Sequence, residues 1–372
     1  MCTPEIPRPY RRDVFKDDGG ASTGAEGAAS AASAGAVGIH GAPGDGAAGS
    51  RGAGAVGAPG ALRDGPVGAA GAPSDAAVGA PGAGGGSRRD SRPSFAPAPT
   101  PLPVPVHDNH THFDFGDSLV ALKDALDAAE AVGIAGAVQV GCDLESSRFT
   151  VEAVDLDPRV LGAVAIHPND APELAGVPSS AGGSALEAAL EEIDAMAAHP
   201  RIRAIGETGL DYFRTGPDGI ADQKYSFRRH IDIAKRRSLA LQIHDRDAHS
   251  DVVTVLREEG APSCVVFHCF SGDAELAKIC NENGWYMSFS GTLTFKNAQN
   301  LRDALAVADP ALLLVETDAP FLTPHPHRGR PNASYMLPYT VQSMAQLLGR
   351  DLADLGMLLR SNTEAVYGSW DS

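Results

Sequence analysis

The stretch Asp108-Asn-His-Thr-His112 places two imidazoles two residues apart, directly after the apolar run 102–106. Side chains at positions i and i+2 of a strand point to the same face, so these two histidines are expected to converge. Two convergent imidazoles are half of a site for zinc or another first-row divalent ion. Further residues of ligand type also follow short apolar runs, and these are Glu207, His244, His268 and Asp318. The sequence therefore predicts a metal centre.

The elements that must hold these residues are short apolar runs separated by amphipathic helical segments. The predicted strands are 104–109, 137–140, 160–166, 203–206, 240–243, 264–267, 286–288 and 312–315. Strands that are apolar throughout favour a parallel sheet covered on both faces. Eight strands alternating with helices in about 270 residues have the size and rhythm of a (β/α)8 TIM barrel, an α/β fold. An open doubly wound sheet is the alternative, but no G-x-G-x-x-G loop follows any strand.

A barrel would bring the ligand candidates to one face. His110 and His112 follow the first predicted strand, and the other candidates follow the fourth, fifth, sixth and eighth strands. Active sites of TIM barrels lie at the C-terminal ends of the strands. A carboxylate such as Glu207, placed directly after a buried run, also needs a partner, and a cation is a suitable one. The candidates are therefore expected to meet at this face.

Residues 1–100 differ in composition from the rest of the chain. They hold 22 of the 42 glycines, and Gly-Ala-Pro fragments recur in them without a strict three-residue period. Such a segment cannot bury enough apolar surface to offset its ordering entropy. We therefore expect a disordered Ala/Gly/Pro-rich N-terminal extension over residues 1–100, followed by one TIM-barrel hydrolase domain over residues 101–372.

The formal net charge of −17 lies entirely on residues 101–372, because residues 1–100 carry nine basic and nine acidic residues. An acidic domain argues against binding nucleic acid through a broad basic surface. It does not argue against a nuclease whose bound cations neutralise the phosphate locally.

The sequence offers no sign of export or membrane insertion. No run of about 18 apolar residues is present, so no membrane span is expected, and the N-terminus lacks the apolar core of a signal peptide. The five cysteines form no C-x-x-C pair, which favours a reduced, cytoplasmic protein. Cys269 stands beside His268, but strand alternation predicts that it points to the opposite face, so it is not expected to be a nucleophile.

Seven motifs in this chain together resemble the TatD family of metal-dependent DNases. The motifs are Asp108-Asn-His-Thr-His112, Ile166-His-Pro168, Ala204-Ile-Gly-Glu-Thr-Gly-Leu-Asp211, His244-Asp-Arg246, His268-Cys-Phe-Ser-Gly272, Glu316-Thr-Asp-Ala-Pro320 and Arg328-Gly-Arg-Pro-Asn332. The resemblance runs from about residue 106 to residue 367. It implies a TIM-barrel metallohydrolase of the amidohydrolase type with two divalent metal ions, Mg²⁺, Mn²⁺ or Zn²⁺. It also implies hydrolysis of phosphodiester bonds in DNA, often as a 3′-to-5′ exonuclease.

The resemblance also implies roles for individual residues. The metal ligands would be His110, His112, Glu207, His244, His268 and Asp318. Glu207 is the candidate bridge between the two ions, because a carboxylate has two oxygens to offer, and Asp318 is the candidate general base. His167, Arg246 and Arg328 are the candidate substrate-binding residues, although Arg328 and its neighbour Arg330 are equally compatible with solvated loop charges. The chain departs from the family at Ala333-Ser334, where the family tends to Glu-Pro.

Three functions are compatible with this site. The first is hydrolysis of DNA, either single-stranded or at its ends, and the second is hydrolysis of a small molecule or an aminoacyl ester. Outward-facing aromatic rings and arginines at the rim would favour nucleic acid, whereas a closed apolar pocket would favour a small substrate. The third is an inactive barrel that acts as an interaction module, which would be expected to have lost ligands. The ligand set is intact.

Overall fold

The core of the fold is a ring of parallel strands. The computed structural model describes residues 94–115, 119–176 and 183–370. Eight strands follow one another through one sheet in chain order, every neighbouring pair parallel. They are β1 (Val106–Thr111), β2 (Ile134–Gly141), β3 (Val160–Val164), β4 (Ile202–Asp211), β5 (Ala240–Arg246), β6 (Val265–Phe267), β7 (Tyr286–Phe289) and β8 (Leu313–Val315). The ring closes where the His110 carbonyl accepts from the Asp318 N–H and the His112 N–H donates to the Ala319 carbonyl. The predicted TIM barrel is confirmed.

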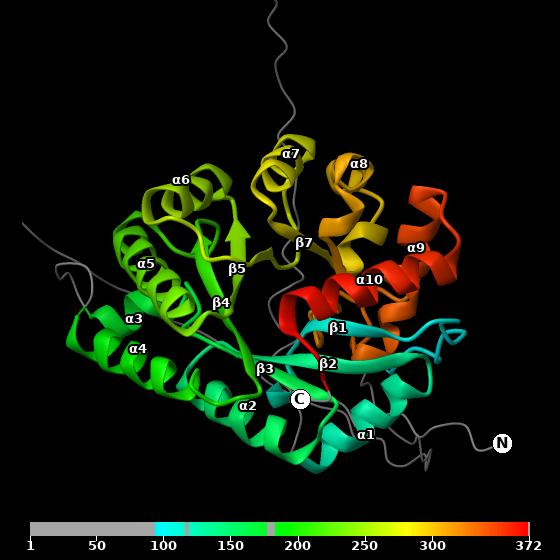
Figure 1. The fold of residues 1–372 in the computed structure, drawn as a ribbon, viewed down its shortest axis with the longest axis horizontal. Coiled ribbons are helices and arrows are strands. Elements are labelled where there is room, and N and C mark those ends of the chain that lie inside the picture. Colours follow the sequence, from blue (N-terminus) through cyan, green and yellow to red (C-terminus); the bar gives the residue numbers. More distant parts are fainter. Residues whose placement is uncertain (1–93, 116–118, 177–182, 371–372) are drawn as a thin grey trace, which may run out of the picture. The chain divides into compact units, whose positions relative to one another are not determined.

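Helices α1 to α9 surround the strands in chain order, and α10 follows them (Figure 1). They are α1 (Leu119–Glu130), α2 (Leu144–Leu156), α3 (Ala171–Ala175), α4 (Ser184–Met196), α5 (Ile220–Arg237), α6 (His249–Glu259), α7 (Ala274–Asn283), α8 (Gln299–Val307), α9 (Leu337–Leu348) and α10 (Leu352–Tyr367). Short 3-10 helices are η1 (Phe113–Phe115), η2 (Pro217–Gly219), η3 (Gly291–Thr294), η4 (Pro310–Leu312) and η5 (Ser334–Met336). Helix α10 packs at the N-terminal end of the barrel, where the Tyr367 hydroxyl accepts from Gln242 inside it at 2.7 Å.

Five strands, β1, β2, β4, β5 and β7, extend beyond their predicted C-terminal ends. Strand β4 continues to Asp211 because its pairing with β5 continues, with Gly209 opposite His244. Gly209 has φ +137, and a Cβ there would lie 2.1 Å from the His244 carbonyl oxygen, so this close approach requires glycine. Consequently Glu207 and His244 lie within their strands rather than after them, and His110 likewise lies within β1.

Two apolar clusters stabilise the barrel. The smaller one fills its interior with alternate strand residues, among them Val138, Leu161, Ala204, Val266 and Leu314. The larger one lies between the strands and the surrounding helices. Such an interior is a packed core rather than a pore. The polar ligand candidates therefore lie next to a tightly packed apolar interior.

The chain packs against the barrel before β1 begins. Ala96 is fully buried, and its carbonyl oxygen accepts a hydrogen bond from the Tyr335 hydroxyl at 2.6 Å. Residues 94–100, assigned to the extension by composition, are thus part of the packed structure, while residues 1–93 lie outside the described residues. Among the helices of the described part of the chain, each is too short or too polar to cross a lipid bilayer.

Replacing Leu161 by Ala should destabilise the barrel by about 2–5 kcal/mol, because the side chain is fully buried inside it and its loss leaves a cavity. The midpoint of urea unfolding, followed by circular dichroism, would fall. Leu156→Ala is the matched control, since Leu156 is 56% exposed on α2. An equal shift in both variants would contradict a packed interior.

Candidate metal centre

Glu207 lies at the centre of the clustered polar residues and faces two groups of imidazoles. Its Oε2 atom is 3.5 Å from His110 Nε2 and 3.9 Å from His112 Nε2. Its Oε1 atom is 2.6 Å from His244 Nδ1 and 2.8 Å from His268 Nε2. The carboxylate is buried. Each oxygen atom thus belongs to a different group of potential ligands.

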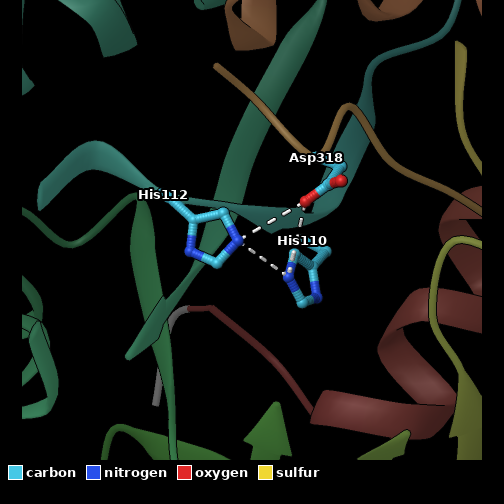
Figure 2. A group of neighbouring side chains, drawn as sticks. All are labelled: His110, His112 and Asp318. Atoms are coloured by element: carbon cyan, nitrogen blue, oxygen red, sulfur yellow. Dashed lines mark hydrogen bonds and ion pairs between the residues drawn. The ribbon is translucent and has the colours of Figure 1, made fainter. Parts of the chain in front are cut away.

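The first group consists of His110, His112 and Asp318. Figure 2 shows both imidazole rings turned toward the Asp318 carboxylate. The two Nε2 atoms are 3.2 Å apart, and Asp318 Oδ1 is 3.4 Å from His112 Nε2. The opposite ring nitrogens are held by oxygen atoms, since His110 Nδ1 lies 3.0 Å from Gln242 Oε1 and His112 Nδ1 lies 3.0 Å from the Val140 carbonyl. These oxygens can only accept, so each Nδ1 carries the hydrogen and each neutral ring has a bare Nε2.

Four hydrogen-bond acceptors therefore face one another: two Nε2 atoms, Glu207 Oε2 and Asp318 Oδ1. Acceptors at such distances repel unless a proton or a cation lies between them. In the absence of a cation a proton takes this place: burial lowers the pKa of His112, but a protonated Nε2 that donates to Asp318 and lies near further carboxylates outweighs burial and raises this pKa to about 9. The donor set of imidazole nitrogens and carboxylate oxygens therefore fits a divalent metal ion.

The second group is formed by His244, His268 and His167 around Glu207 Oε1. His268 Nδ1 lies 3.0 Å from Glu316 Oε1, so its Nε2 is the atom that faces Glu207. His167 Nε2 is 3.5 Å from Glu207 Oε1, which places this predicted substrate-binding residue among the potential ligands as well.

The carboxylates of both groups are held in their ionised form. Burial raises the pKa of Glu207, but the positive field of His268 and His167 outweighs it and brings the pKa well below the ordinary value. Burial also acts to raise the pKa of Asp318, and its hydrogen bond to His112 together with the field of the neighbouring imidazoles lowers that pKa instead. Both side chains are thus available as ligands.

Two polar residues at this site were missed by the sequence analysis. Asp211 Oδ2 lies 3.2 Å from His244 Nε2, and the Cys142 thiol lies 3.5 Å from Glu207 Oε2. Cys142 lies directly after β2 and close to the predicted strand 137–140, so its strand-end position could have identified it. Asp211 lies beyond the predicted strand 203–206, and its place at the end of the motif that contains Glu207 is the signal that could have found it.

Cys269 is excluded as a nucleophile, but for a different reason from the predicted one. Strand β6 ends at Phe267, so strand alternation does not reach this residue, whose φ is +39. Its thiol lies 3.3 Å from Ser290 Oγ, and burial raises the pKa of Cys269 to about 12. A thiol with such a pKa is not reactive near neutral pH.

The three arginines of the predicted rim differ in their contacts. The Arg246 guanidinium lies 3.9 Å from the ring centroid of Phe213, and that of Arg328 lies 4.0 Å from the centroid of Phe295. Within the described residues, neither of these guanidinium groups forms an ion pair. Arg330 instead donates to the Phe95 carbonyl at 3.1 Å.

A TIM barrel with clustered imidazoles and carboxylates at the C-terminal ends of its strands defines the class of metal-dependent hydrolases built on this fold. Residues 107–368 match the family described as TatD related DNase, and the chain belongs to the TatD family.

Relatives in other organisms match the same part of the chain. The uncharacterized metal-dependent hydrolase TatD of Mycobacterium tuberculosis is 43% identical over 267 residues, which cover 70% of this chain and 97% of that protein. The uncharacterized metal-dependent hydrolase YabD of Bacillus subtilis is 34% identical over 262 residues, covering 70% of this chain and 98% of that protein. The crystal structure of YjjV, a TatD homolog from Escherichia coli K12, shares the fold with a TM-score of 0.64 at 23% identity, covering 71% of this chain and 98% of that one.

Asp211→Asn should lower the affinity for a divalent metal ion by about 10–100-fold, because the amide nitrogen can no longer accept from His244 Nε2 and the ring loses its fixed tautomer. Competition between the apoprotein and a chromophoric chelator measures this affinity. Asp218→Asn, at an exposed position of η2, is the control. An unchanged affinity in Asp211→Asn would mean that His244 is not a ligand.

Proposed function

We propose that this protein hydrolyses phosphodiester bonds in DNA with two divalent cations. His110, His112 and Asp318 would hold one cation, His244 and His268 the other, and Glu207 would bridge them. The observation that carries the proposal is that the two carboxylate oxygens of Glu207 face separate groups of potential ligands. When bound, such cations supply an activated water and neutralise charge on the phosphate.

Asp318 is the proposed general base. Its side chain is 14% exposed, whereas that of Glu207 is 6% exposed, so Asp318 lies nearer to the solvent side of the cluster. Although burial acts to raise its pKa, the imidazoles that face it lower that pKa below the ordinary value. It is therefore ionised at neutral pH, and its free carboxylate oxygen is suited to take a proton from the attacking water.

The rim supports a nucleic acid as the substrate. Phe213 lies two residues after the end of β4 and is 64% exposed, with the Arg246 guanidinium over one face of its ring. Phe295 and Arg328 form a second pair of the same kind after β7 and β8. Phe295 is half-buried, whereas an exposed ring such as that of Phe213 can stack on unpaired bases, and guanidinium groups without a carboxylate partner bind phosphate.

Two further rings flank His112. Phe115 and Phe321 lie 5.8 Å and 6.2 Å from its imidazole, centroid to centroid, and 5.5 Å from each other. By contrast Phe113 and Phe270, which also follow the ends of β1 and β6, are buried. Because rings bind unpaired bases, this arrangement favours single-stranded DNA or DNA ends over the interior of a duplex.

We also propose a cytoplasmic location. The four cysteines of the described residues are free thiols, as expected in a reducing compartment. Fractionation of cells that express the protein would test this.

The full chain is expected to shorten end-labelled single-stranded DNA stepwise in the presence of Mg²⁺ or Mn²⁺. EDTA and His268→Ala should each abolish the reaction, and the label lost first shows the polarity. If folded, metal-loaded protein does not cleave DNA, the substrate is instead a small molecule or an aminoacyl ester, which the same metal centre could hydrolyse.

Glu207→Ala should abolish the hydrolysis and leave the fold near intact, since the side chain lies above the packed interior of the barrel. Activity is measured on labelled DNA and folding by circular dichroism. Full activity in this variant would rule out the shared-carboxylate arrangement.

Phe213→Ala should raise KM for a single-stranded oligonucleotide by about 5–100-fold, because a stacked base contributes about 1–3 kcal/mol. Hydrolysis of a small phosphodiester, bis(p-nitrophenyl) phosphate, should keep its kcat, since this substrate has no base to stack. Met357→Ala, which alters a 54% exposed apolar side chain on α10, is the control. Equal losses on both substrates would argue against a base platform.

A further inference from the structure

The chain contains a packed segment that precedes the region shared with its relatives. The family match begins at residue 107, whereas described residues begin at residue 94. Within this segment, residues 95–97 carry most of the contacts, and they are called the strap here. The Ala96 carbonyl accepts from Tyr335 at 2.6 Å, the Phe95 carbonyl accepts from Arg330 at 3.1 Å, and the Pro97 carbonyl lies 3.5 Å from the Tyr339 hydroxyl.

The segment runs along the barrel wall from one end to the other. Arg330 and Tyr335 belong to the connection that follows β8, so the strap lies at the C-terminal, catalytic end of the strands. Leu102, in contrast, donates its N–H to the Val132 carbonyl directly before β2, at the opposite end. The strap therefore touches the catalytic face before the chain enters the barrel.

The strap contacts the loop that carries Arg328. Within the loop 323–330, the Thr323 hydroxyl donates to the Arg330 carbonyl at 2.6 Å, and His327 Nε2 lies 3.0 Å from the Tyr339 hydroxyl. Arg330 and Tyr339 are the partners of Thr323 and His327 in these contacts, and both also form hydrogen bonds with the strap. Arg328 itself is exposed, and among the described residues its guanidinium group is held by its stack on Phe295.

We propose that the strap 95–97 is a positioning element that fixes the loop 323–330 and thereby sets the place of Arg328 on the substrate rim. The part that concerns substrate rests on the proposed function; the part that concerns the loop does not. The strap is anchored by Tyr335 and acts on the loop through Arg330 and Tyr339.

Ala96→Asp in the full chain displaces the strap, because a fully buried Ala has no room for a carboxylate. Ala98→Asp is the matched control, since it makes the same substitution at an exposed alanine two residues further along the chain. Arg330→Gln is a second variant, which removes only the contact of an exposed side chain with Phe95 and keeps the fold.

Trypsin reports on the loop directly through the peptide bond after Arg328. Cleavage there, followed by mass spectrometry, should become roughly three- to tenfold faster in Ala96→Asp and Arg330→Gln, as expected for the loss of about one hydrogen bond. It should stay unchanged in Ala98→Asp. The bond after Arg229, in the middle of α5, should stay protected in all variants, which distinguishes local release from unfolding. Unchanged cleavage after Arg328 in both strap variants overturns the proposal.

The second readout is a split between KM and kcat. KM for a single-stranded oligonucleotide should rise roughly three- to tenfold in the strap variants, while kcat for bis(p-nitrophenyl) phosphate stays at the wild-type value. Faster cleavage of the loop with unchanged KM overturns its role in substrate binding. If the wild-type protein does not act on DNA at all, the proposed function fails, and the trypsin experiment still decides whether the strap holds the loop.

Discussion

The site depends on one electrostatic constraint. Four hydrogen-bond acceptors, the two Nε2 atoms of His110 and His112 and one oxygen each of Glu207 and Asp318, lie close together and repel one another in the absence of a cation or a proton. The barrel supplies the force that holds them together. Strand β1 is tied to the stretch after β8 by backbone bonds and by Asp108, whose carboxylate accepts from both the N–H and the hydroxyl of Thr317. The backbone of Asp318 adopts φ +54, a conformation that costs about 1–3 kcal/mol for a residue other than glycine. The closed ring thus holds an arrangement that a free chain would avoid.

The outer part of the site meets a different requirement. Under the proposed function, a chain with a net charge of −17 has to approach a polyanion without a broad basic surface. The guanidinium groups of half-buried Arg246 and exposed Arg328, which lie over Phe213 and Phe295, make no ion pair within the described residues. Each ring orients its arginine without neutralising it, as a carboxylate partner would. The charge that the proposed function needs is thus concentrated at two points of the rim.

The sequence predicted the fold and the convergence of the ligand candidates because both follow from local patterns. Short apolar runs define parallel strands, and polar residues at their ends share a face. The distribution of protons on the rings could not be predicted, because it depends on oxygens such as Gln242 Oε1, which lies 132 positions from His110. Phe213 and Phe270 both follow strand ends, yet the first is exposed and the second is buried. This difference arises from tertiary packing, which a local sequence pattern does not show. The burial of Ala96 could not be predicted, because the composition around it is that of a low-complexity tail and its contact with Tyr335 joins positions far apart in the sequence.

The closure of the ring also bears on the order in which the molecule is built. Asn109 donates to the Val315 carbonyl across 206 positions, and Asp108 bonds Thr317 across 209. Contacts so remote in sequence form late, because the loop between them must be closed first. During synthesis, the two imidazoles of β1 leave the ribosome long before the carboxylate that completes their group. A nascent chain therefore holds an incomplete set of ligands until nearly the whole barrel has been made, and metal capture belongs to the final stage of folding.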